Sequence, residues 1–154
     1  MELQTLTKTA FCVIGKEGST ADAPDFVRRL WEDANAHFAE VAHLAKKDEN
    51  GGLAGIWGAM TDDSRAFAPW KNNFSEGLYL AGVEVAEDAE APAGWTKWRI
   101  PAFEYLVAKV QGEDTFSAVI AYMAENNIPL AGAVQDFTCP ETGENRMFFP
   151  IKRL

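Results

Sequence analysis

Two carboxylates in apolar strand patterns are the residues of this sequence best placed to do chemistry. Glu104 lies in a run that predicts a β-strand over residues 102–110, where period-2 alternation puts it on a face with three apolar side chains. Asp136 alternates with Val134 and Thr138 in a strand predicted near the end of the chain. An unpaired carboxylate is costly to bury. Each acid is therefore expected to stay wet at a strand edge, to find a structural hydrogen bond, or to meet a cation that a ligand brings.

Other reaction centres have little support in the sequence. His37 and His43 are the only histidines, and their spacing of six residues does not place them on one helix face. Cys12 and Cys139 form no CxxC or Cys/His cluster. The sequence contains no GxSxG, HExxH, GxGxxG or P-loop pattern. We therefore expect no metal site, no cofactor and no nucleophilic triad.

Aromatic side chains are abundant, with ten Phe, five Trp and three Tyr. Trp70, Trp95 and Trp98 occur in segments rich in Pro, Gly and polar residues, where a tryptophan must cover a core edge or line a cleft. Aromatic faces beside a carboxylate suit a flat, lipophilic cation, although most aromatic side chains simply pack in cores. The candidate ligand-binding residues are Glu104, Asp136, Tyr105, Trp57, Trp70, Phe74, Tyr79, Trp95, Trp98 and Phe148.

Length and charge narrow the class of protein. The 154 residues fit a single domain, 1–154. A net charge of −9 argues against nucleic acid and against anionic membrane surfaces as partners. Without a signal-peptide pattern or a membrane-spanning apolar run, the protein is expected to be cytoplasmic. Glu84 ends a predicted strand beside an acidic loop, so it is expected to be solvated.

The predicted elements form a repeated order of strand, helix, strand and strand. LAG at residues 53–55 recurs 77 residues later, and each copy opens a strand after a helix. This favours an α+β fold of two halves, about 1–90 and 95–154, with an antiparallel sheet, helices on one face and a cleft between the halves. The predicted strands are 7–15, 53–60, 77–85, 102–110, 130–138 and 146–152, with a helix over 24–47, a long loop over 61–76, a second helix after Gly112, and Pro150 at an edge or a bulge.

Several segments resemble a known family. GIWGAMTDD, PWKNNFSEGLYLAGVEV, GWTKWRIPAFEY, LAGAVQDFT and MFFPI look like a stand-alone branch of the bacterial GyrI-like and AraC-type effector-binding domains, over about Phe11 to Leu154. The resemblance implies two units related by a pseudo-twofold axis, with hydrophobic and often cationic compounds bound between them by an acidic residue and aromatic rings. Asp136, four residues before Pro140, matches the acidic position, and Tyr105 matches the strand tyrosine. Phe103 stands where the family commonly has Gly, which would narrow the cleft.

Three functional hypotheses follow. The first is a stand-alone protein that captures lipophilic, cationic aromatic compounds. The second, taken from hydrolases in the same family, is hydrolysis of reactive electrophiles by Glu104 with Trp95 or Trp98. The third is an acidic module that inhibits a protein partner. The sequence leaves monomer and homodimer equally open.

Overall fold

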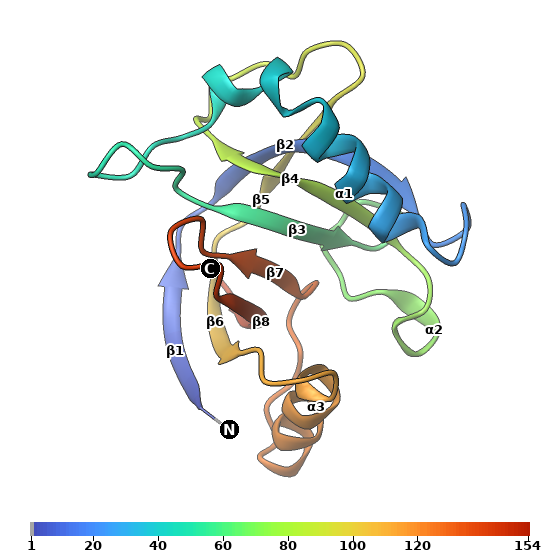
Figure 1. Ribbon diagram of the computed structural model, residues 1–154. Helices are drawn as coiled ribbons and strands as arrows, with labels where there is room; N and C mark the ends of the chain where they lie inside the picture. Colours follow the sequence, from blue (N-terminus) through green and yellow to red (C-terminus); the bar gives the residue numbers. More distant parts are fainter. Residues whose placement is uncertain (1) are drawn as a thin grey trace.

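The fold is a single curved sheet with helices, seen in a computed structural model that describes residues 2–154 (Figure 1). Hydrogen bonds join the strands into one eight-stranded antiparallel sheet, which confirms the predicted α+β class. In chain order the elements are β1 (Leu3–Lys8), β2 (Phe11–Ser19), α1 (Phe26–Ala36), β3 (Ile56–Thr61), α2 (Lys71–Phe74), β4 (Leu78–Val85), β5 (Thr96–Ile100), β6 (Phe103–Lys109), α3 (Thr115–Glu125), β7 (Gln135–Thr138) and β8 (Asn145–Arg153). The sheet order is β1-β6-β8-β7-β3-β4-β2-β5.

The sheet consists of two matching halves that meet where β3 pairs with β7. On one side lie β3, β4, β2 and the edge strand β5; on the other lie β7, β8, β6 and the edge strand β1. Each half is a strand–helix–strand–strand unit with one added edge strand. The two edge strands were not predicted, because their sequences, LQTLTK and TKWRI, are short and charged as edge strands usually are.

The first helix is shorter than the periodicity predicts. α1 ends at Ala36, and the chain continues as two 3₁₀ turns, Phe38–Glu40 and Ala42–Leu44. His37 leaves helical geometry, with φ −117° and ψ 18°. Phe38, Val41 and Ala45 still pack into the core beneath α1, and Ala45 pairs with Val85 at the end of β4. The apolar stripe therefore marked burial correctly, while tertiary pairing replaced the helix beyond residue 36.

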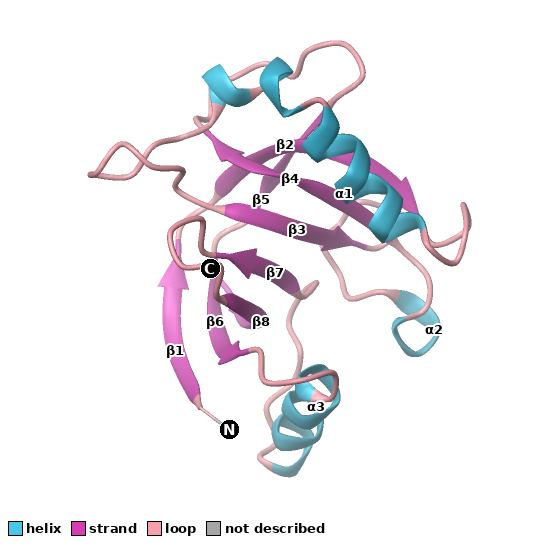
Figure 2. Cartoon of the chain, viewed as in Figure 1, coloured by secondary structure: helices cyan, strands magenta, loops and turns pink. Residues whose placement is uncertain are grey.

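Both long helices cover the same face of the sheet. α1 packs on β2 and β4, and α3 packs on β6 and β8, toward opposite ends of the sheet (Figure 2). Because side chains alternate along a strand, the opposite face has a core of its own, built from all the longer strands and rich in aromatic rings. None of the described helices is both long enough and apolar enough to cross a membrane.

Glu84 departs from the expected solvated position. Its side chain lies on the face opposite the helices, and the residue is only 5% exposed. The indole Nε1 of Trp57 donates a hydrogen bond to Oε1 at 3.0 Å, and Lys8 Nζ lies 3.4 Å from the carboxylate. The acid was misjudged because the lysine that pairs with it lies 76 residues away in sequence.

Candidate ligand-binding cleft

A cleft lies on the helix-covered face, directly over the junction of the two halves. Its volume is about 430 Å³. Gly58 of β3 and Asp136 of β7, which are paired across the junction, form its floor together with Tyr79 of β4. Trp31 of α1 and Phe116 of α3 line it from the two halves. The two units thus each contribute one aromatic residue from their helix.

Gly58 makes room for this floor. A Cβ atom at this position would lie 2.0 Å from the hydroxyl oxygen of Tyr79 and 3.3 Å from Cβ of Asp136. The first distance is far below any real contact, so any larger residue would displace the phenol. Glycine within a strand commonly marks such a close approach. The absent side chain allows the Tyr79 hydroxyl to reach the junction beside Asp136.

The Asp136 carboxylate has no partner of opposite charge. It is partly buried, and burial raises its pKa to about 6. Among the described residues it forms no hydrogen bond or ion pair. Arg146, which also lines the cleft, donates instead from Nε to Glu144 at 2.7 Å. At neutral pH the cleft therefore presents a negative charge that has lost much of its hydration and gained no compensating cation.

Tyr79 and Trp31 form a hydrogen-bonded aromatic pair beside this charge. Trp31 Nε1 donates to the Tyr79 hydroxyl at 3.0 Å, and the two rings meet edge to face. Burial, and secondarily the nearby Asp136 charge, raise the pKa of the Tyr79 phenol. The phenol therefore keeps its proton at physiological pH, and that proton remains available to an acceptor in the cleft.

Two smaller cavities adjoin the cleft. The Phe74 chamber, about 200 Å³, shares Phe116 with the cleft and is lined by Met60, Pro69, Trp70, Phe74, Phe116 and Val134. The Trp95 chamber, about 110 Å³, shares Trp31 with the cleft and also includes Phe38, Ile56 and Trp95. Aromatic side chains thus border the cleft on two sides, with the carboxylate between them.

The structure places the residues selected from the sequence in different parts of the molecule. Asp136 and Tyr79 line the cleft, Trp70 and Phe74 line one chamber, and Trp95 lines the other. Four aromatic residues of the set line none of these cavities and pack instead in the core on the opposite face of the sheet: Trp57, Trp98, Tyr105 and Phe148. Alternation assigns residues to two faces, but it does not say which face the helices cover.

Trp31, Gly58 and Phe116 are cleft residues that the sequence analysis did not select. Trp31 is a large aromatic residue beside the buried stripe of its helix, and Gly58 interrupts a strand. Both were recognisable signals.

Glu104, the second acid selected from the sequence, does not line this cleft. It is partly exposed and lines none of the cavities described, and its carboxylate forms no hydrogen bond or ion pair with the described residues. The β6–β8 register shifts beside it, between the Glu104–Lys152 and Tyr105–Pro150 pairs, so Pro150 lies next to the irregularity. Trp95 and Trp98 do not approach it either: their Nε1 atoms donate to Glu40 at 2.8 Å and to Glu17 at 2.6 Å. The predicted pairing of either tryptophan with Glu104 is therefore absent.

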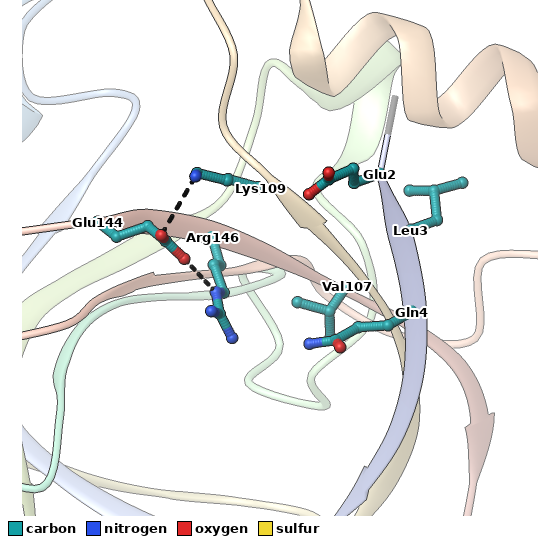
Figure 3. A pocket seen from close by; sticks show the side chains of 7 residues that line it. All are labelled: Glu2, Leu3, Gln4, Val107, Lys109, Glu144 and Arg146. Carbon is teal, nitrogen blue, oxygen red and sulfur yellow. Dashed lines mark hydrogen bonds and ion pairs between the residues drawn. The ribbon is translucent and has the colours of Figure 1, made fainter.

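A larger cavity, about 560 Å³, lies at the outer ends of β1, β6 and β8 (Figure 3). Three of its charged residues already pair with one another, since Glu144 accepts from Arg146 Nε and lies 3.3 Å from Lys109 Nζ. None of the residues selected from the sequence lines it. Among residues 2–154, no group of three or more His, Cys, Asp or Glu side chains is arranged to hold a metal ion. The cleft over the β3–β7 junction is therefore the candidate site.

Comparison with known proteins identifies the fold. No protein-family model matches the sequence, and no curated protein does. Solved structures do match: SAV2435 bound to tetraphenylphosphonium has a TM-score of 0.68 at 16% identity, covering 99% of this chain and 94% of that one. The EcmrR C-terminal domain has a TM-score of 0.64 at 11% identity, covering 99% and 98%. A putative transcription regulation protein from Staphylococcus aureus MU50 has 0.58 at 18%, covering 99% of both.

Proposed function

The chain has the fold of GyrI-like effector-binding domains, as its sequence resemblance implied, and we propose that it binds a lipophilic organic cation in the cleft, with Asp136 as the counter-ion. The observation that carries this proposal is a desolvated carboxylate without a protein cation, placed between aromatic walls. A cation that reaches it recovers an attraction strengthened by the low local dielectric. The carboxylate has already lost hydration on folding, so binding costs less than pairing two hydrated ions.

The aromatic walls add selectivity for large organic cations over simple metal ions. The rings of Trp31 and Phe116 offer apolar contact, and an aromatic face attracts a nearby cation through its quadrupole. The net charge of −9 favours the approach of cations to the whole molecule. SAV2435, whose fold is similar, has been solved with tetraphenylphosphonium, a cation of this kind.

The direct test is a titration with tetraphenylphosphonium, followed by tryptophan fluorescence and calorimetry. Asp136→Asn should weaken binding by more than about tenfold, since removing one partner of a buried charge pair costs at least 2 kcal/mol. Asp88→Asn and Glu104→Gln make the same change in net charge outside the cleft, and should leave affinity within about twofold. Equal affinity in Asp136→Asn and Asp88→Asn would refute the role of Asp136.

A second function, hydrolysis of an electrophile, is favoured by one observation. The pKa of Asp136, at about 6, suits a general base or acid near neutral pH. Water activated by this carboxylate could open an aryl epoxide, with the oxygen of the broken C–O bond protonated to give a diol. Diol formation from styrene oxide that disappears in Asp136→Asn would establish it; binding without product would exclude it.

A further inference from the structure

The cleft and its two chambers lie in a row along β3. Ile56, Gly58 and Met60 are alternate residues of this strand and therefore share one face. Ile56 lines the Trp95 chamber, Gly58 the cleft and Met60 the Phe74 chamber. Two residues along a strand span about 7 Å, so the floors of neighbouring cavities are about that far apart. Asp136 of β7 lines the cleft, and Val134, two residues earlier and just before β7 begins, lines the Phe74 chamber.

The Phe74 chamber suits an aromatic ring. All six of its lining residues are apolar or aromatic, so its side chains offer little to hold an ordered water. Phe74 meets Phe116 edge to face at 5.1 Å. The Trp70 indole is fixed because its Nε1 donates to the Leu78 carbonyl at 3.0 Å. Gly77 leaves space for that indole, since a Cβ there would lie 2.1 Å from Trp70 Cδ1.

The wall that carries Phe74 is held in an unfavourable backbone conformation. Asn72, Asn73 and Phe74 all have positive φ, at 50°, 57° and 63°. This region is disfavoured for residues with a Cβ, and a phenylalanine there is an outlier. The Ser75 hydroxyl donates to the Asn72 carbonyl at 2.6 Å, and an isolated backbone β-bridge between Lys71 and Glu76 closes the turn. Such strain collects at ligand clamps, and here it directs an aromatic ring toward Phe116.

From this arrangement we infer that the Phe74 chamber is a subsite for an aryl arm, so that the ligand is an elongated cation whose charge lies over Asp136 and whose outer ring enters the chamber. The inference rests on the proposed function, because the charge over Asp136 sets the position of the arm. It adds a length requirement that the charge alone does not impose. Since Phe116 borders both cavities, its ring contacts the ligand at the point where the arm leaves the cleft.

Two quaternary ammonium probes test the subsite. Benzyltrimethylammonium carries one ring beside its charge, and (biphenyl-4-ylmethyl)trimethylammonium carries a second ring one ring length further out. Burying the outer ring should make the longer probe about tenfold tighter. If neither probe binds, the proposed function fails. If both bind with equal affinity, the proposed function stands and the subsite is refuted.

Variants locate the outer ring. Phe74→Ala removes one wall of the chamber, and Val134→Phe fills the space from its floor. Either substitution should abolish the tenfold higher affinity of the longer probe. The affinity for benzyltrimethylammonium, which has no outer ring, should stay the same. Phe38→Ala makes the same truncation as Phe74→Ala in the Trp95 chamber and should preserve the advantage. A loss of the advantage in Phe38→Ala with none in Phe74→Ala would place the arm in the opposite chamber and overturn the inference. Phe74→Ala decides the outcome if Val134→Phe fails to fold, because Phe74 lies in a surface turn.

Discussion

Asp136 should make the ligand-free protein less stable as the pH rises, and Asp136→Asn should remove this effect. The ordinary pKa of an aspartate is 3.8, and burial raises that of Asp136 to about 6. The folded protein therefore holds the proton more tightly than the unfolded chain does. The contribution of Asp136 to stability is greatest below pH 4, falls as the pH rises toward 6, and changes little above that value. The full loss is about 3 kcal/mol, since each tenfold change in proton affinity corresponds to about 1.4 kcal/mol.

The charged groups around the cleft leave this expectation unchanged. Tyr79 stays protonated throughout the range, and Arg146 is paired with Glu144. Replacing Asp136 with the neutral, nearly isosteric Asn should stabilise the protein at pH 8 by about 2 to 3 kcal/mol more than it does at pH 4. Subtracting the stability change measured at pH 4 from the change measured at pH 8 removes the cost of burying the new amide, because that cost does not depend on pH.

Urea unfolding followed by tryptophan fluorescence at pH 4, 6 and 8 measures this difference. Asp88→Asn is the matched control, because Asp88 is exposed and its replacement changes the net charge equally. Parallel pH profiles for Asp136→Asn and Asp88→Asn would refute the reasoning. They would show that the Asp136 carboxylate is either hydrated or neutralised in the folded protein.

Three further outcomes are expected. Gly58→Ala should destabilise the protein by about 1 to 3 kcal/mol and weaken cation binding in a calorimetric titration, because the alanine Cβ would collide with the Tyr79 hydroxyl. Unchanged binding would mean that the phenol has no part in the site. Tetraphenylphosphonium should bind about tenfold more weakly at pH 5 than at pH 8, since Asp136 is then mostly protonated; an affinity independent of pH would contradict its role as counter-ion. Asp62→Asn should lower the free energy of unfolding by about 2 kcal/mol at neutral pH and speed amide exchange in loop 61–76. Burial opposes the ionisation of Asp62, but hydrogen bonds from Ser64 and from backbone amides of the loop hold its pKa at about 2. Exchange rates equal to those of the wild type would show that Asp62 does not order the loop.

The sequence could predict the central part of the fold because apolar periodicity reports burial. It indicated the repeated strand–helix–strand–strand units and a cleft between the two halves. It missed β1 and β5, whose side chains alternate weakly because each is an edge strand. It extended α1 past Ala36, because an apolar stripe persists through 3₁₀ turns that also pack on the core.

The site itself could be predicted only in part. Asp136 and Glu104 have similar neighbours in sequence, and only the three-dimensional arrangement places one in the cleft and the other outside it. Likewise, Trp57 and Gly58 are adjacent, yet they belong to opposite faces of the sheet. Identifying the helix-covered face requires knowing how the two halves pair, which depends on contacts between residues about 80 positions apart.

The central claim is that Asp136 recognises positive charge, and two ions of the same shape test it most directly. Tetraphenylphosphonium and tetraphenylborate differ in the sign of their charge while presenting the same four phenyl rings. Calorimetry should show that the wild-type protein binds the phosphonium and discriminates strongly against the borate, and that Asp136→Asn loses most of this discrimination while Asp88→Asn retains it. Equal binding of both ions by the wild type, or discrimination that survives in Asp136→Asn, would contradict the account.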